Sequence, residues 1–425
     1  MNGYSPLEHT LRYIICAISP SKDDWSIRFQ LIEELRAVVE PIESLRGATV
    51  EPFGSFVSDL FTRWGDLDIS IELANGSYIA SAGKKHKQNL LEDVLKALKI
   101  KGGCRKLRFI TNARVPILKF QGKYNISCDI SINNLSGQMK SKLLYWISTI
   151  DGRFRHMVLL VKEWAKAQSI NDSKSGTLNS YSLSLLVIFH FQTCEPAILP
   201  PLKEIYPRNM VDDLTGVRVT AENLIEETCA VNINRFKSNS SRAQNDSSLA
   251  DLFISFIGKF CDISSKASDQ GISTYTGQWE DIEGNMRWLP KTYSLFIEDP
   301  FEQPANTARS VSSTQLANIS EAFQSTYNML TSPNQDKKLL LSTLMKPPTT
   351  KFAGGTPTRN YGNYSRDGVR IQQAQRTTQP SLQHQFQDMR INRQQPNRAI
   401  HRPSQDSPAQ LQPVWRPKYD KKIAE

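Results

Sequence analysis

The sequence has no long hydrophobic run and few cysteines. None of its apolar stretches approaches the ~20 residues that a membrane-spanning helix needs, and no hydrophobic segment follows a basic start as in a signal peptide. The six cysteines include no C-x-x-C pair, so the usual zinc spacing is absent. We therefore expect a soluble intracellular protein, in the cytoplasm, the nucleus or both, that binds no membrane.

Positive charge is concentrated near the C-terminal end. Residues 346–425 contain 14 Lys and Arg against 5 Asp and Glu, a surplus of nine in a chain whose net charge is +10. This segment also has 12 glutamines and few aliphatic side chains, so we expect it to be disordered. A basic tail suits contact with a nucleic-acid backbone, although a solubilising or protein-binding tail fits the composition as well.

The hydrophobic pattern changes twice along the chain. Helical spacing is found in residues 1–40 and again from 147 to about 322, whereas strands and one helix are predicted between 45 and 132. This order predicts a strand-rich domain joined to a mostly helical one. The predicted parts are N-terminal helices (1–44) that pack on the helical domain, a strand-rich domain (45–146), a helical domain (147–330) and the tail (346–425).

Two predicted strands carry aspartates on one face. In 66–73 carboxylates alternate with aliphatic side chains, which places Asp66 and Asp68 on the same face. In 124–133 the same alternation places Asp129 on the polar face. If the strands are neighbours, the three carboxylates repel one another unless a cation lies between them, and oxygen ligands suit Mg²⁺ or Mn²⁺. The alternative is that Asp66 and Asp68 are ordinary charges at a strand edge.

A Gly-Ser pair precedes these aspartates. Gly54 allows a close approach of the backbone to a ligand, and Ser55 offers a hydroxyl and an N–H to phosphate oxygens. Ten residues separate Ser55 from Asp66, enough for a short helix. Each motif alone is weak. Together with the third aspartate they predict a site that holds a nucleoside triphosphate by its phosphates and two metal ions by carboxylates.

This combination resembles the polymerase-β-type nucleotidyltransferases, and within them the terminal nucleotidyltransferases that add uridines or adenosines to RNA 3′ ends. The resemblance covers about residues 5–330. Within this family, the sequence is similar in detail to the plant uridylyltransferases that tail unprotected small RNAs. It implies an α+β fold, with a polymerase-β-like palm domain and a mostly helical poly(A) polymerase-associated domain. The matching stretches are FGSFVSDLFTRWGDLDISIEL, RVPILKF, SCDISINN, MVLLVKEWAKAQSIND, GTLNSYSLSLLVIFHFQ and SLFIEDPFEQPANTARSV.

The resemblance assigns the catalytic roles to the aspartates. It implies that Asp66 and Asp68 hold two Mg²⁺ or Mn²⁺ ions. Asp129 would complete the first metal site, where the RNA 3′-hydroxyl is activated. Gly54 and Ser55 would contact the β- and γ-phosphates.

Further nucleotide contacts are implied by the helical part. Lys162 and Lys166 would reach the triphosphate, although two lysines four residues apart would by themselves indicate a solvated helix face. Ser180 would contact phosphate, and Tyr181 would stack on the base.

The base edge is where this sequence departs from its relatives. The resemblance places Asp299 and Glu302 near that edge, but Ala305 replaces a histidine that is frequent in relatives preferring UTP. Asn306 is a candidate substitute donor. Lys140 stands where relatives often have an asparagine that contacts the ribose. These changes leave the choice between UTP and ATP open.

The resemblance implies an RNA 3′-terminal uridylyltransferase that adds uridines from UTP to small RNAs or decay intermediates and promotes their degradation. Its substrates would be an RNA 3′ end and UTP, and argonaute-type or RNA-decay proteins are candidate partners through the tail. The alternatives are an RNA adenylyltransferase and a catalytically weak RNA-binding adaptor. The three aspartates argue against the adaptor.

Overall fold

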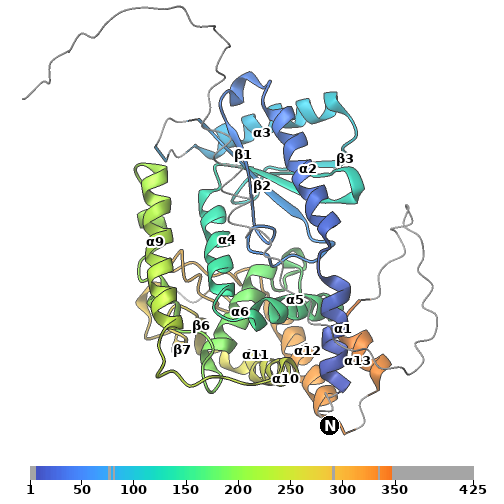
Figure 1. Ribbon diagram of the computed structural model, residues 1–425, viewed down its shortest axis with the longest axis vertical. Helices are drawn as coiled ribbons and strands as arrows, with labels where there is room; N and C mark the ends of the chain where they lie inside the picture. Colours follow the sequence, from blue (N-terminus) through green and yellow to red (C-terminus); the bar gives the residue numbers. More distant parts are fainter. Residues whose placement is uncertain (1–5, 75–77, 80–81, 290–291, 334–335, 347–425) are drawn as a thin grey trace, which may run out of the picture. The chain divides into compact units, whose positions relative to one another are not determined.

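A computed structural model describes residues 6–74, 78–79, 82–289, 292–333 and 336–346 (Figure 1). These residues belong to one compact unit, Met1–Lys351. Apart from Lys346, the predicted disordered tail (346–425) lies outside the described residues. Within the described ranges, none of the helices combines the length and hydrophobicity that a membrane crossing requires.

The unit contains a mixed five-stranded sheet in the order β1-β2-β5-β4-β3. Strands β2 and β5 are parallel, whereas the other neighbouring pairs are antiparallel. The strands are β1 (Thr49–Phe53), β2 (Leu67–Glu72), β3 (Arg105–Ile110), β4 (Ile117–Gln121) and β5 (Ser127–Ile132).

One face of this sheet is apolar and covered by helices. Alternate side chains of β2 and β5, such as Ile69 and Ile130, are fully buried. Helix α3 (Lys84–Lys101) packs on β3, β4 and β5, and α2 (Lys22–Val39) packs on β1 and α3, as Figure 1 shows. The opposite face of the sheet is therefore the one left for polar side chains.

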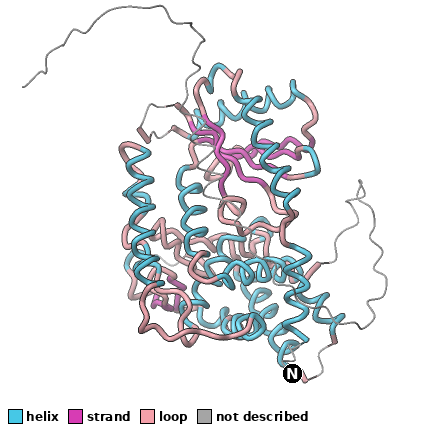
Figure 2. Tube along the Cα trace, viewed as in Figure 1, coloured by secondary structure: helices cyan, strands magenta, loops and turns pink. Residues whose placement is uncertain are grey.

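Below the sheet in Figure 2, helices predominate. The two most deeply buried are α5 and α6, which pack against each other and carry a long run of buried side chains. The Trp164 indole N–H donates to Thr326 Oγ1 at 3.0 Å and links α5 to α12. The helices of this half are α4 (Leu135–Ser148), α5 (Gly152–Ala167), α6 (Ser180–Thr193), α7 (Leu202–Ile205), α8 (Met210–Asp213), α9 (Arg218–Lys237), α10 (Leu249–Lys259), α11 (Ile263–Lys266), α12 (Ser313–Thr331) and α13 (Lys337–Leu344).

The two N-terminal helices pack on different parts of the unit. Helix α1 (Pro6–Ile18) contacts α5, α10 and α13 of the helical half. Helix α2 contacts β1 and α3 instead, so the prediction that both helices pack on the helical domain is wrong for α2. Its sequence shows an apolar helix face but not which apolar surface covers that face.

Two local predictions also differ from the structure. The predicted strand 124–133 begins only at Ser127. Tyr124 and Asn125 both have a φ of 60°, which is outside the extended conformation, so the strand cannot start at these residues. In the segment predicted to be helical, β6 (Gln270–Ser273) and β7 (Gln278–Asp281) form a hairpin. Its turn contains Gly277 at a φ of 73°, a conformation that suits glycine.

The position of α1 can be tested by its buried residues. Leu11 is fully buried in the helical core, so Leu11→Ala is expected to lower the free energy of unfolding by about 2–5 kcal/mol. Tyr13, on the same helix, is 52% exposed, and Tyr13→Ala is the matched control with little expected effect. Urea unfolding followed by circular dichroism measures both. Equal losses in the two variants would contradict the packing of α1.

Candidate active site

The three predicted aspartates lie together at one end of β2. Asp68 and Asp129 are direct register partners in the parallel pair β2–β5, which places their side chains on the same sheet face. Asp66 comes just before β2. Burial, and after it the charges of Asp129 and Asp66, raise the pKa of Asp68 to about 7. Burial and the nearby Asp129 also raise the pKa of Asp66. The site thus holds more negative charge than its surroundings stabilise.

A divalent cation would suit these carboxylates. Asp129 Oδ2 accepts a hydrogen bond from Lys119, but the buried Asp129 Oδ1 has no partner. Such an orphaned oxygen is what a metal ion would satisfy, and the oxygen-only donor set fits Mg²⁺ or Mn²⁺. Among the described residues, however, no three Asp, Glu, His or Cys side chains are grouped closely enough to hold an ion as they stand. Lys119, which sequence reasoning left without a role, neutralises Asp129 in this arrangement.

The Gly54–Ser55 turn contacts the aspartates directly. Gly54 has a φ of 70°, and a Cβ atom there would lie 2.0 Å from Asp68 Oδ2, so only glycine fits. Its N–H donates to Ser141 Oγ of α4 at 2.7 Å. The residues that follow form turns rather than the predicted short helix. The Leu60 N–H reaches back to the Ser55 carbonyl at 2.9 Å and closes the loop.

Two lysines of α5 face the same space. Lys162 is buried, its Nζ donates to the Leu60 carbonyl at 2.9 Å, and burial followed by the charge of Lys166 lowers its pKa to about 8. Lys166 is more exposed and pairs with Glu163 at 2.8 Å. The solvated-face interpretation is therefore wrong for Lys162, whose ammonium points inward.

A cavity of about 460 Å³ connects these groups. It is a size typical of small-molecule sites. Gly54 and Ser55, Asp66 and Asp68, both lysines, and Ser180 and Tyr181 of α6 all line it, together with Lys140 and Ser141 of α4. The structure therefore places eight of the predicted site residues around one cavity, and Asp129 beside it.

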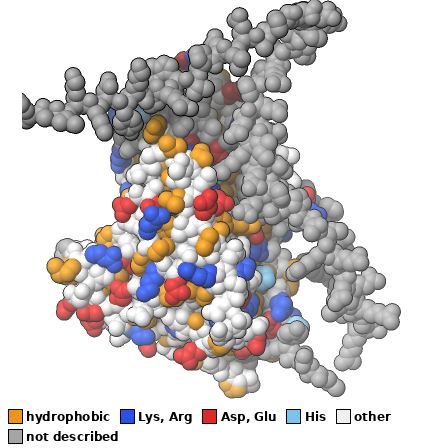
Figure 3. Space-filling view, turned by 60° about the vertical axis from the view of Figure 1, so that its left-hand side comes forward, with side chains coloured by type: hydrophobic (Ala, Val, Ile, Leu, Met, Phe, Trp, Pro, Cys, Tyr) orange, Lys and Arg blue, Asp and Glu red, His pale blue; other side chains and the backbone are white. Residues whose placement is uncertain are grey.

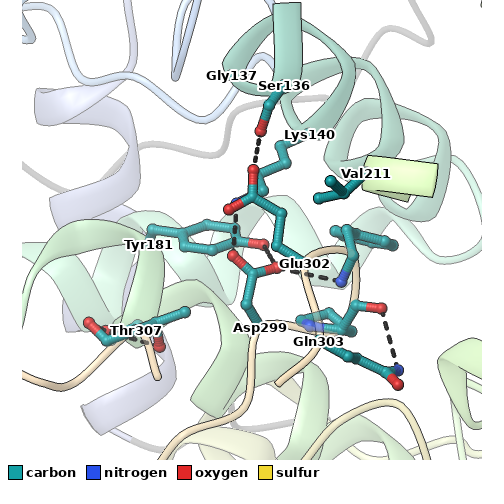
Figure 4. A network of polar contacts seen from close by, with 12 residues as sticks. Ser136, Gly137, Lys140, Tyr181, Val211, Asp299, Glu302, Gln303 and Thr307 are labelled. Atoms are coloured by element: carbon teal, nitrogen blue, oxygen red, sulfur yellow. Dashed lines mark hydrogen bonds and ion pairs between the residues drawn. The ribbon is translucent and has the colours of Figure 1, made fainter. Parts of the chain in front are cut away.

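The predicted base-edge residues lie behind this lining (Figure 4). Asp299 is hydrogen-bonded by the Tyr181 hydroxyl at 3.1 Å and paired with Lys140. Glu302 lies 3.1 Å from the Lys140 ammonium and accepts from Ser136. Burial alone would raise the pKa of Glu302, but Lys140 and the Ser136 hydroxyl outweigh it and leave that pKa below its usual value. Neither carboxylate lines the cavity, so each acts on it through Lys140 or Tyr181.

Asn306 does not serve as a base-edge donor in this structure. It is buried, its Nδ2 donates to the Leu295 carbonyl at 2.8 Å, and its Oδ1 accepts from the Ile297 and Ala308 N–H groups. Its carboxamide therefore fastens the loop that carries Asp299. The prediction that Asn306 replaces the missing histidine disagrees with these contacts. The cation that contacts both base-edge carboxylates is Lys140, which the sequence analysis did not assign to the base edge.

Comparisons with known proteins agree with this geometry. A family model for the central palm domain of mitochondrial-like poly(A) RNA polymerase matches residues 7–149. Protein HESO1 of Arabidopsis thaliana is 60% identical over 327 residues, which cover 77% of this chain but only 64% of HESO1. The chain is therefore similar in sequence to RNA terminal nucleotidyltransferases, although it spans less than two thirds of HESO1. The family model places a palm domain over its sheet and the first helices.

Two solved structures share the fold. A cytoplasmic RNA terminal U-transferase has a TM-score of 0.62 at 23% identity, over 81% of this chain and 100% of that chain. The Cid1 poly(U) polymerase with MgGTP bound has a TM-score of 0.62 at 24% identity, over 80% of this chain and 99% of that chain. At such identities the likeness shows the fold alone.

The carboxylate repulsion predicts a pH-dependent stability. The pKa of Asp68 is about 7 in the folded state, above its ordinary value of 3.8. Between pH 3.8 and 7 the folded state therefore binds a proton more strongly at Asp68 than the unfolded state does. The free energy of unfolding contributed by Asp68 therefore falls as pH rises through this window. Asp68→Asn cannot ionise and is expected to be more stable than the wild type at pH 8, with a smaller difference at pH 5. Thermal unfolding in EDTA measures this difference.

Asp93→Asn is the matched control. Asp93 is largely exposed, and hydrogen bonds from Lys96 and Ser44 lower its pKa, so its replacement gives no gain at pH 8. A loss of stability in Asp68→Asn at pH 8 would show that the aspartates do not repel one another as described.

Proposed function

We propose that this protein transfers uridylyl groups from UTP to RNA 3′ ends by a two-metal mechanism. The observation that carries the proposal is the pairing of Asp68 with Asp129 beside a cavity that Gly54, Ser55 and two lysines line. Paired metal ions at these carboxylates would stabilise the attacking and leaving oxygens of an in-line displacement. The sequence similarity to RNA terminal nucleotidyltransferases supports the reaction class.

The residues of the chain then have distinct tasks. Lys162 and Lys166, with Ser55 and Ser180, would hold the triphosphate, and Lys162 remains mostly protonated at neutral pH because its pKa is about 8. The 3′-oxygen attacks the α-phosphorus while the bond to pyrophosphate breaks, and the lysines balance the charge that pyrophosphate carries away. Asp129, at the margin of the cavity, would serve the 3′-hydroxyl rather than the nucleotide.

The base would be bound between α4 and α6. The ring of Tyr181 offers a stacking surface that is indifferent to base identity. Selection must then come from Lys140, whose ammonium lies 5.5 Å from the Tyr181 ring centroid and is held by Asp299 and Glu302. An ammonium only donates hydrogen bonds, so it favours carbonyl oxygens such as those of uracil over the amino group of adenine.

An adenylyltransferase is the second candidate. It is favoured by the name of the matching family model, which describes a poly(A) RNA polymerase. The palm geometry serves either nucleotide, because the triphosphate contacts do not involve the base.

The cellular setting is proposed from the sequence. We infer that small RNAs or decay intermediates are the acceptors and that uridylation promotes their degradation in the cytoplasm, the nucleus or both. The tail, with its surplus of nine positive charges, would add affinity for RNA or recruit argonaute-type or decay proteins.

The nucleotide preference is the first test. Purified protein, a 5′-labelled RNA and each of the four nucleoside triphosphates in turn should give faster extension with UTP than with ATP. Lys140→Met should reduce this preference, because it removes the ammonium that would donate hydrogen bonds to the carbonyl oxygens of uracil. Lys142→Met is the control on the same helix, since Lys142 pairs with Glu222 outside the cavity. Faster extension with ATP by the wild type would establish the adenylyltransferase instead.

The phosphate turn is the second test. Gly54→Ala should lower UMP addition by about 10²-fold, because a displaced Asp68 carboxylate misaligns the reacting groups. Gly152→Ala is the matched control, since no atom lies within 4 Å of a Cβ there. Full activity in Gly54→Ala would contradict the role of this turn.

A further inference from the structure

A row of charged side chains crosses the sheet from the catalytic aspartates to its edge. Asp129 of β5 is the register partner of Asp68 on one side and of Lys119 of β4 on the other. Lys119 is in turn the partner of Arg108 on the edge strand β3. Register partners point to the same face of a sheet. Four adjacent strands therefore carry, in order, two carboxylates, an ammonium and a guanidinium on the same face of the sheet.

The two ends of this row differ in their surroundings. The nucleotide cavity lies at the Asp68 end, among residues of the Gly54 turn, α4, α5 and α6. Neither Lys119 nor Arg108 lines this cavity. Arg108 is exposed, and the Lys119 side chain is 26% exposed. The cationic end of the row is thus open to a ligand that the nucleotide cavity does not hold.

The chemistry of the transfer identifies that ligand. In an in-line displacement the attacking oxygen approaches opposite to the leaving pyrophosphate. If the triphosphate lies at the Asp68 end, the 3′-hydroxyl must arrive from the Asp129 end. The last nucleotides of the acceptor then run over β4 and β3. Neighbouring strands are about 4.8 Å apart, so Lys119 and Arg108 lie within reach of the last one or two phosphodiesters.

We propose that Lys119 and Arg108 bind the 3′-terminal phosphates of the acceptor RNA. This inference rests on the proposed function and names where the second substrate enters. Without RNA, the Lys119 ammonium is held by Asp129 Oδ2. An arriving phosphate competes for that ammonium and frees the Asp129 carboxylate for the reaction. Lys119 is thus a positioning residue as well as a phosphate ligand.

Basic side chains on two other surfaces of the described residues do not offer the same geometry. On the face that Figure 3 brings forward, Lys and Arg are interspersed with Asp and Glu and form no continuous positive track. The lysines of α3 belong to a helix that covers the opposite, apolar face of the sheet. Lys99 of α3 is exposed and supplies a control with the same charge.

Binding of a 5′-labelled single-stranded RNA is measured by fluorescence anisotropy at several salt concentrations, in EDTA and without nucleotide. Each phosphate contact contributes about 0.7 to the slope of log affinity against log salt. Arg108→Gln and Lys119→Gln should each weaken binding several-fold and flatten the slope by roughly that amount. Lys119→Arg, which keeps the charge, should restore binding. Lys99→Gln should leave the slope as in the wild type.

An RNA with uncharged methylphosphonates at its last two linkages identifies the phosphates. It should bind the wild type more weakly than the natural RNA, but the Arg108→Gln, Lys119→Gln double variant should bind both RNAs equally. In steady-state extension, Arg108→Gln should raise the KM for RNA and leave the KM for UTP unchanged. A merely structural role would not separate these constants.

These experiments distinguish a failure of the proposed function from a failure of the inference about Lys119 and Arg108. If the wild type adds no nucleotide to RNA, the proposed function is wrong. If the wild type is active but Arg108→Gln and Lys119→Gln behave like Lys99→Gln, the acceptor does not follow this row and the inference is overturned. A methylphosphonate penalty that persists in the double variant would overturn it as well.

Discussion

The site depends on holding three carboxylates side by side at the start of β2. Parallel pairing of β2 with β5 sets Asp68 against Asp129, and burial then raises the pKa of Asp68 to about 7. Neighbouring features offset or accommodate this unfavourable charge. Gly54 leaves room for the Asp68 carboxylate, Lys119 neutralises Asp129, and Lys162 brings a buried positive charge to the other side. A carboxylate cluster that the protein by itself stabilises poorly is preorganised for cations, and the proposed reaction would use them there.

The helical half completes the site from the opposite side of the cavity. Lys140 on α4 reaches across to Asp299 and Glu302 on the loop before α12, and Tyr181 on α6 shares Asp299 with it. The same contacts that would fix the nucleotide's base also tie α4 to that loop. Under the proposed function, nucleotide choice and the position of α4 against this loop would both depend on one ammonium group. Any change at Lys140 is expected to alter both.

Much of this arrangement could be predicted from the sequence, because strand alternation shows which residues share a face. It placed Asp66 and Asp68 together and made Asp129 their partner once the strands were assumed to be neighbours. Alternation does not show what crosses from one strand to the next, so Lys119 was missed between two buried neighbours in RVPILKF. The roles of Asn306 and of α2 were also predicted wrongly. The backbone contacts of the buried Asn306 carboxamide depend on the folded loop around it. The surface that α2 covers depends on the folded sheet, and neither follows from the local sequence pattern.

The central claim is that these carboxylates hold metal ions next to a bound UTP. The most direct measurement is a crystal structure with Mn²⁺ and a non-hydrolysable UTP analogue, in which anomalous scattering locates the metal. We expect two manganese peaks, about 3.5–4 Å apart, bridged by Asp66 and Asp68, with Asp129 on the one nearer the acceptor side. The triphosphate should lie along Gly54, Ser55, Lys162 and Lys166. A triphosphate bound elsewhere, or manganese away from these aspartates, would contradict the account.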